Sequence, residues 1–429
     1  MRKKSSNGRK VRFCPTQKDI ADALGVSQST VAMALSPQHE HKLLVETVEK
    51  IRKYAAEVGY HPQRFAQIMQ GGHTRIVGVI VRLGIYTNNH EMVSLLANEL
   101  NRAGYQLVLV DPVWFGGNHE AVKKYLLDQG VEGVVLCNVS PNTEAQALRG
   151  QLPATMPTFS LQSSRGEDPS LRADLEAAYY HMTRLHLALG SRRLSLLAMF
   201  RDLGHLDRPA WTVRDRVSGF MRAIQEAGGV LVADEDVREL LEIPNCRSAA
   251  RKSDKLVGRV IYPIRMNPVR NAYENGFHQT LRLIDTESLP DSLICANDDG
   301  ALGALAACSD RGISVPHSIR ISGHDDTMAG RFGTVPLTTI RPPLEALVKK
   351  TAAGIVACIR NHAENQPTGP LPSEPCEIVV TGSCGTREEI QQVADTGFFQ
   401  SGKNIRFEWA PDEDRLHRFE NLIANNTTP

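Results

Sequence analysis

The sequence predicts an all-α helix-turn-helix head joined to an α/β body of two lobes, each built on a parallel, doubly wound sheet. The segment Thr16–Leu35 has the spacing of two short helices that cross steeply. Two successive series of short apolar strands alternating with amphipathic helices follow it. The charge divides in the same way, because residues 1–75 carry a net charge of +7 and the rest of the chain −6.

Length and composition fit a globular protein of more than one domain, with 429 residues, 41% hydrophobic and 23% charged. No apolar run reaches the roughly 18 residues of a membrane span. The basic N-terminus, MRKKSSNGRKVRFCP, has no apolar stretch behind it, so we expect a cytoplasmic protein. The eight cysteines form no CxxC pair and no Cys/His cluster. We therefore predict reduced, mostly buried thiols, no bound metal and no cofactor.

The first helix of the head begins at Thr16, which caps it with Asp19 three residues later in capping-box spacing. Ala21 is small enough to let two helices touch where they cross. Gly25 suits the tight turn between the helices, because it tolerates a left-handed backbone. Ser27 caps the second helix.

The second helix has one apolar face and one outward face. Val31 and Ala34 point inward. The outward positions can enter a major groove: Gln28, Ser29, Ala32 and Met33. A generic helical hairpin would explain the apolar spacing equally well, but not the placement of the small residues. The basic charge of the head favours a polyanionic partner over a merely solvated basic tail.

A third helix is predicted over Leu44–Val58, followed by Gly59 as its C-cap. The chain then reads Tyr60-His61-Pro62 and a short stretch to Gln70. The chain here resembles the head, hinge and first core strand of the lactose-repressor (LacI/GalR) family. The stretches that carry the resemblance are, in order, DIADALGVSQSTVAMAL, VEKIRKYAAEVGYHP and RFAQIMQGGHTRIVGVIV.

This resemblance implies a domain order. It gives a basic arm (1–15), a helix-turn-helix domain (16–61), a hinge helix and linker (62–74), a two-lobed effector-binding and dimerisation domain (75–385) and a C-terminal extension (386–429).

The resemblance also implies roles for the hinge. In that family, hinge helices pair in the minor groove, and an apolar side chain from each wedges the central base step open. The matching residue is Met69, where the family usually has Leu, and Ala66 on the same stretch joins the predicted DNA-binding residues. The alternative is that Met69 packs under the hinge.

The head departs from the family at Ala32-Met33, where the family usually has Ser-Arg, because methionine cannot make the bidentate contact of arginine to guanine. The loop SPQHEHKL also lacks the usual Asn-Gly and the Val-Ser cap of the third helix. We therefore expect unusual specificity, with readout by Gln28, Ser29 and Thr30, by phosphate contacts and by DNA shape. The predicted DNA-binding residues of the head also include Thr16, Ser27 and Met33. The alternative is that these side chains form only a solvated helix face.

The body alternates predicted strands and helices. The first series has strands at 76–81, 105–111, 131–136 and 156–161 and helices at 91–103 and 121–129. The second has strands at 194–199, 293–298 and 319–326 and a helix at 213–227. The resemblance continues through the body and implies a periplasmic-binding-protein-like core. The stretches that carry it are RVSGFMRAIQEAGG, CANDDGALGALAACSDRGISVPHSIRISGHDD and VPLTTIRPPLEALVKKTA.

Ligands of such cores lie beyond the carboxyl ends of the strands, between the lobes. The resemblance points to Arg216 and Asp325, and further to Asn297 and Asp174, as effector-binding residues. The alternatives are an Arg–Asp pair that holds the lobes together, and helix caps.

The first-lobe wall of this site departs from the family, because the run from Tyr86 to His90 replaces an aromatic-rich one. Tyr86 and Asn88 are the candidates there, and the effector is expected to differ from a simple hexose. The chain also carries an insertion at 247–256, for which no role is predicted. The tail after Gly385 is expected either to pack on the core or to aid oligomerisation, and the sequence does not choose between the two.

The resemblance implies a sequence-specific transcriptional regulator, by default a repressor, whose affinity for a near-palindromic operator is set by a small-molecule effector, such as a sugar or related metabolite. It implies a homodimer, because one head reads only a half-site. It also implies that the protein acts on the nucleoid. An enzyme is disfavoured, since no P-loop, GxSxG or HExxH motif is present. A solute-binding receptor would need a secretory signal and no DNA-binding head.

Overall fold

The structure is a computed structural model, and it describes residues 15–35, 42–58, 60, 73–83, 88–137, 144–162, 170–198, 211–233, 256–261, 271–286, 288–361, 372–396 and 405–407. The chain divides into two compact units, residues 1–74 and 75–429, which are described separately below. Within the described ranges, no helix is both long and apolar enough to cross a membrane.

The head contains three helices around a small core. Their bounds are α1 (Gln17–Leu24), α2 (Gln28–Ala34) and α3 (Val45–Glu57). Thr16 and Asp19 form the predicted capping box, and Gly25 ends α1 with a φ of 71°. Ala21 and Val31 are buried in the core. The predicted caps at Thr16 and Ser27, the crossing point and the turn at Gly25 are therefore confirmed. Gly59, the predicted C-cap of the third helix, lies outside the described residues, and the C-cap of α3 is Val58.

The first lobe of the body is a parallel sheet with strand order β2-β1-β3-β4-β5 in the described residues. The strands are β1 (Ile76–Val81), β2 (Gln106–Val110), β3 (Gly133–Cys137), β4 (Thr158–Leu161) and β5 (Ser170–Leu171). The helices are α5 (Asn88–Arg102), η2 (Pro112–Phe115), α6 (His119–Asp128), α7 (Glu144–Gln151) and α14 (Leu344–Arg360).

The second lobe is a larger sheet with the order β13-β12-β11-β10-β9-β6-β8-β7. Its strands are β6 (Arg193–Leu197), β7 (Val230–Ala233), β8 (Val257–Ile261), β9 (Ser292–Cys295), β10 (Arg320–His324), β11 (Thr338–Arg341), β12 (Glu377–Val380) and β13 (Ile405–Phe407). Its helices are α8 (Leu175–Ala188), α9 (Trp211–Glu226), α11 (Ala272–Asp285), α12 (Asp298–Asp310), α13 (Met328–Arg331) and α15 (Arg387–Asp395).

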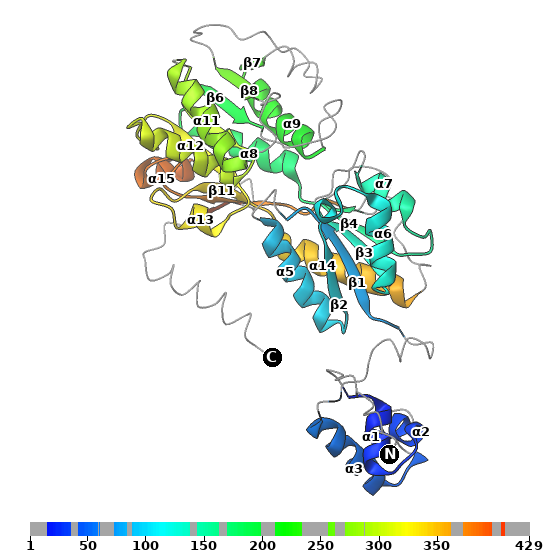
Figure 1. The fold of residues 1–429 in the computed structure, drawn as a ribbon. Coiled ribbons are helices and arrows are strands. Elements are labelled where there is room, and N and C mark those ends of the chain that lie inside the picture. Colours follow the sequence, from blue (N-terminus) through cyan, green and yellow to red (C-terminus); the bar gives the residue numbers. More distant parts are fainter. Residues whose placement is uncertain are drawn as a thin grey trace, which may run out of the picture. The chain divides into compact units, whose positions relative to one another are not determined.

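Helices cover both faces of each sheet, as a doubly wound fold requires. In the first lobe α5 lies beside α14, and α6 lies beside α7 (Figure 1). In the second lobe α8 packs against α9, and α11 against α12. Every predicted strand and helix of the body is present, with bounds that differ by a few residues.

The pairing of β11 with β12 is antiparallel, which the parallel prediction did not include. The cause is the path of the chain. After β11 it passes to the first lobe, where α14 packs on β3 and β4, and it then returns as β12. The chain leaves the second sheet at the carboxyl end of β11 and returns to it beside that same end, so β12 runs antiparallel to β11.

The part of the C-terminal tail that is described packs on the second lobe. Ile390 and Val393 of α15 are buried in the main hydrophobic core. Strand β13 pairs in parallel with β12, with Ile405 opposite Ile378. Of the two roles left open for the tail, core packing is therefore the one these segments show. The insertion is outside the described residues except for Leu256.

Candidate functional site

The outward face of α2 is held rigidly by its neighbours. Gln28 and Ser29 are exposed, while Thr30 and Met33 are half-buried. The Ser27 hydroxyl accepts from the backbone N–H of Thr30 at 3.0 Å and lies 2.7 Å from the Ser29 hydroxyl. Gln28 and Ser29 are thus presented at the start of a capped helix, where base and phosphate contacts are made in helix-turn-helix proteins.

The two other helices of the head differ in how they begin. The Thr16 backbone N–H and hydroxyl both donate to the Asp19 carboxylate, at 2.8 and 2.7 Å. Helix α3 has no side-chain cap, because Leu44 occupies the N-cap and is 77% exposed. Arg52 of α3 instead anchors α2, since its Nε donates to the Ala34 carbonyl at 3.2 Å.

Several predicted site residues lie outside what the structure describes. Ala66 and Met69 of the hinge, and Tyr86 of the first-lobe wall, are among these. Asn88 begins α5, but its side chain is not described. Their roles remain predictions.

The predicted effector residue Arg216 lies in a buried polar cluster at the carboxyl ends of β9 and β10. It is only 8% exposed, and its Nε donates to the Tyr179 hydroxyl at 3.1 Å. That hydroxyl lies 3.3 Å from the Cys295 carbonyl and 3.3 Å from Nδ1 of His324. One consistent assignment is that Tyr179 donates to Cys295 and accepts from Arg216 and His324.

Burial sets the charge state of this cluster. It holds the pKa of His324 well below the usual value, and the neighbouring Arg216 lowers it further. Burial also raises the pKa of the Tyr179 hydroxyl, although Arg216 opposes that shift. His324 and Tyr179 are therefore neutral, and Arg216 supplies positive charge in a place largely shielded from water. This arrangement suits a ligand with polar or anionic oxygens.

Tyr179 and His324 were not among the predicted site residues. His324 could have been found, since it immediately precedes Asp325 in the GHDD stretch. Tyr179 had no such signal, because only the fold brings the middle of α8 to the ends of β9 and β10.

The other three predicted effector residues also lie near strand ends or lobe crossings. Asp325 follows β10, with its carboxylate 3.9 Å from Nε2 of His324. Asn297 caps α12 by accepting from the Gly300 N–H at 2.9 Å, and Asp174 caps α8 by accepting from the Ala177 N–H at 3.1 Å. The capping roles weighed as alternatives for Asn297 and Asp174 are thus present, and contact with an effector remains a prediction.

Thiols and metal-ligand clusters add no further site in the described part of the chain. The six described cysteines are free and buried, as predicted. The described residues contain no group of three or more His, Cys, Asp and Glu side chains that could hold a metal ion.

Two parts of the chain match known protein families, and the chain is similar over most of its length to known repressors. Residues 16–63 match the family described as bacterial regulatory proteins, lacI family, and residues 186–384 match a periplasmic binding protein-like domain. The HTH-type transcriptional repressor PurR of Vibrio atlanticus (strain LGP32) is 25% identical over 336 residues, which are 76% of this chain and 87% of the relative. PurR of Glaesserella parasuis serovar 5 (strain SH0165) is 24% identical over 359 residues, 83% of this chain and 93% of the relative.

Solved structures show the same fold. A lac repressor dimer bound to operator and the anti-inducer ONPF has a TM-score of 0.67 and 21% identity, over 87% of this chain and 100% of that one. A complex of the transcriptional regulator CelR with cellobiose has a TM-score of 0.55 and 20% identity, over 86% of this chain and 99% of that one. The predicted fold class, a helix-turn-helix head on a periplasmic-binding-protein-like core, is confirmed.

Proposed function

The chain is a LacI-family protein, with that family's DNA-binding domain joined to a periplasmic-binding-protein-like domain, and from this premise we propose that it represses transcription under the control of a small-molecule effector. The relatives are repressors rather than enzymes, in line with the prediction that this chain is not an enzyme. Because its proposed target is DNA, we expect the protein to act in the cytoplasm, on the nucleoid.

The observation that carries the proposal is the scaffolded face of α2. Gln28 and Ser29 are exposed at its first turn, while Val31 and Ala34 on the opposite side are fully buried in the head. A helix held in this way presents the same side chains to every DNA site it meets. Met33 lies half-buried beside this face, so specificity is expected to depend on Gln28 and Ser29.

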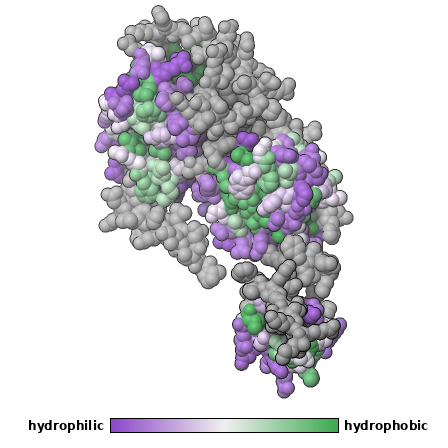
Figure 2. Space-filling model, in the orientation of Figure 1, coloured by the Kyte–Doolittle hydropathy of each residue, from purple (hydrophilic) through white to green (hydrophobic). Residues whose placement is uncertain are grey.

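A homodimer follows from the single head, which can read only one half-site. Half-buried apolar side chains on α5 and on the edge strand β2 offer a surface for the second subunit: Val93, Leu95, Leu107 and Leu109. Figure 2 shows hydrophobic residues gathered on the first lobe in this region. We assign this surface to dimerisation, because apolar area on an unpaired strand edge is otherwise exposed to aggregation.

The buried cluster around Arg216 is the proposed effector site of the second lobe. A buried guanidinium is a donor suited to hydroxyl or carboxylate oxygens of a sugar or related metabolite. Nε2 of the neutral His324, whose Nδ1–H donates to Tyr179, is an acceptor. Asp325 would orient the same ligand. The first-lobe contribution from Tyr86 and Asn88 stays part of the proposal.

In vitro selection from random double-stranded DNA tests the DNA-binding function. We expect an inverted repeat to be enriched by the full chain and not by a variant that lacks residues 1–74. A Gln28→Ala variant should relax the base preference within each half-site, since an adenine contact of glutamine contributes about 1 to 3 kcal/mol of discrimination. Enrichment of random sequence by the intact protein, with binding that simply declines with salt, would contradict the proposal.

A thermal-shift screen of sugars, nucleosides and related metabolites tests the effector site. A ligand at about 100 times its Kd should stabilise the body by about 2.7 kcal/mol. Arg216→Lys should abolish that stabilisation, because lysine cannot reproduce a planar fork of donors. A variant that still responds fully would remove Arg216 from the site.

A further inference from the structure

The turn that follows β10 has an unfavourable backbone. Asp325 has a φ of 119° and Asp326 a φ of 57°, and neither is glycine. Such backbone conformations are strained for residues other than glycine and persist only when their surroundings hold them. Since Asp325 is a proposed effector residue, the groups that hold this turn also set the geometry of the site.

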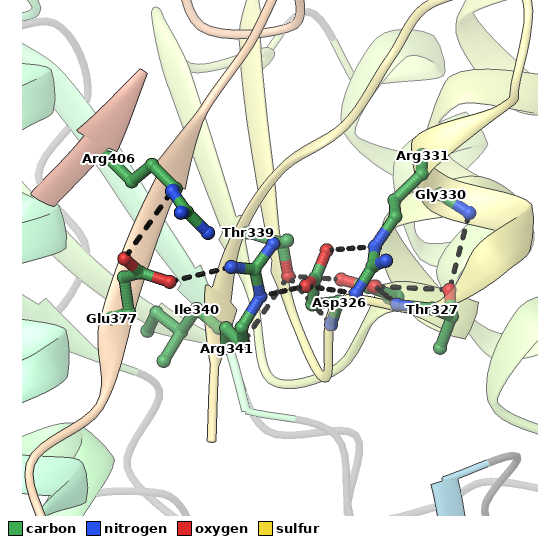
Figure 3. Close-up of polar contacts among 10 residues, drawn as sticks. Asp326, Thr327, Gly330, Arg331, Thr339, Ile340, Arg341, Glu377 and Arg406 are labelled. Carbon is green, nitrogen blue, oxygen red and sulfur yellow. Dashed lines mark hydrogen bonds and ion pairs between the residues drawn. The ribbon is translucent and has the colours of Figure 1, made fainter. Parts of the chain in front are cut away.

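The side chain of Asp326 is the anchor of the turn, and the residue is 3% exposed. Arg331 donates two hydrogen bonds to the Asp326 carboxylate, from Nε to Oδ1 at 2.8 Å and from Nη2 to Oδ2 at 2.5 Å. Nε of Arg341 also donates to Oδ2. Figure 3 shows the two arginines on opposite sides of the carboxylate. One buried carboxylate is thus fixed by two guanidinium groups from α13 and β11.

The network continues from Asp326 to the segments that join the lobes. Nη1 of Arg341 donates to Oε2 of Glu377 at 2.6 Å, and the two residues face each other in the β11–β12 register. Arg341 is the last residue of β11, before the chain passes to α14 of the first lobe. Glu377 is the first residue of β12, after the chain has returned. The pair therefore ties the outgoing crossing to the returning one.

The first lobe also lies within electrostatic reach of these charges. Desolvation raises the pKa of Glu91 in the first turn of α5, and Arg331 opposes that shift, while Asp326 and Glu345 add to it. A change in the position of α5 would therefore change the electrostatic interaction of Glu91 with Arg331 and Asp326.

We propose that the Asp326–Arg341–Glu377 network positions Asp325 for the effector and links that site to the two crossings between the lobes. The inference rests on the proposed function, because it assigns the coupling element of the same effector site. Arg341 and Glu377 are positioning residues that touch no ligand. Loss of either link should leave the sheet folded but separate the turn at Asp325 from the crossings.

Hydrogen exchange of the full-length protein, with and without its selected operator, tests this. Binding free energies couple reciprocally, so operator DNA should alter exchange in the body as an effector alters operator affinity. In the wild type we expect DNA to change exchange together at 325–327, 341–344 and 374–377. In Arg341→Gln and Glu377→Gln the changes at the turn and at the crossings should no longer occur together. Operator affinity should shift by about fivefold or more, the usual lower range of allosteric coupling.

Two variants make the outcome specific. Arg341→Lys retains the charge and should restore part of the coupling, which a purely steric role would not predict. Arg193→Gln removes another second-lobe ion pair, in which Arg193 Nη2 lies 2.7 Å from Asp291 at the amino end of β6, and should leave the coupling intact. Glu377→Gln conserves shape and leaves both arginines on Asp326, so it keeps the test available if Arg341→Gln fails to fold.

Unchanged exchange and unchanged operator affinity in a folded Glu377→Gln protein would overturn the inference and leave the proposed function standing. An equal effect of Arg193→Gln would overturn it as well. Failure of the wild type to select any operator would instead overturn the proposed function, and the inference with it.

Discussion

The two lobes share a sheet design but differ in what they bury. Among described residues, the charged side chain buried in the first lobe is Asp111, which caps η2 and accepts from the Leu83 N–H at 3.0 Å. The second lobe buries several ionisable groups: His186, Asp215, Arg216, Asp298, His324 and Asp326. Buried polar groups must be fully paired to be tolerated, so they define one geometry strictly. The second lobe is therefore the more exactingly specified half of the body.

The largest expected effect comes from helix packing in the second lobe. A Cβ added at Gly303 of α12 would lie 2.0 Å from the Tyr273 carbonyl oxygen of α11, so Gly303→Ala must push backbone apart. We expect it to lower the free energy of unfolding by about 3 kcal/mol. In the first lobe, a Cβ at Gly150 of α7 meets nothing within 4 Å. Gly150→Ala should raise stability by about 0.4 to 1 kcal/mol.

Urea unfolding of both variants measures this difference. If Gly303→Ala and Gly150→Ala shifted the unfolding free energy alike, the close contact of α11 with α12 would not limit stability, and helix packing would not distinguish the two lobes.

The second prediction concerns a buried histidine of the second lobe. Nδ1 of His186 lies 2.9 Å from the Ser292 hydroxyl and Nε2 lies 3.0 Å from the Ser322 hydroxyl. Burial lowers the pKa of His186 from 6.5 to about 3, with a smaller contribution from Arg320. The unfolded chain therefore binds a proton here that the folded protein does not. This contribution to stability is full above the unfolded pKa and is lost as the pH falls toward the folded one.

Between about pH 7 and about pH 5 the loss should approach 2 kcal/mol. Asp298 opposes it, because burial raises the pKa of that carboxyl to about 6, so the total pH dependence is smaller. The measurement is thus a comparison of unfolding free energies of wild type and His186→Gln across this range. Two parallel curves would show that His186 does not carry the effect. His90 of the first lobe is exposed, so His90→Gln is the matched control.

The sequence predicted local features better than distant ones. The capping box at Thr16 and the turn at Gly25 depend on neighbouring residues, and both are present. The strands were recognisable because a strand in a parallel sheet is apolar throughout. The antiparallel entry of β12 could not be predicted, since it depends on a chain excursion through the other lobe.

The same limit applies to the candidate site. Arg216 was identified by resemblance, but its partners Tyr179 and His324 come from α8 and β10, far from it in the chain. The strain at Asp325 likewise has no local signature, because the residue type at that position does not indicate a positive φ angle. Long-range pairing thus decides which polar residues meet, and a single sequence does not contain that information in readable form.

The smallest expected effect is at the carboxyl edge of the first-lobe sheet. Trp114 in η2 is 61% exposed, so its truncation removes little buried area. Trp114→Ala should change the free energy of unfolding by less than about 0.5 kcal/mol. The adjacent Phe115 packs on Tyr125, with ring centroids 5.5 Å apart, and Phe115→Ala should cost about 1 to 2 kcal/mol. A large loss in Trp114→Ala would mean that this edge is held as tightly as the turn at Asp326, and the difference between the two lobes would then lie in charge alone.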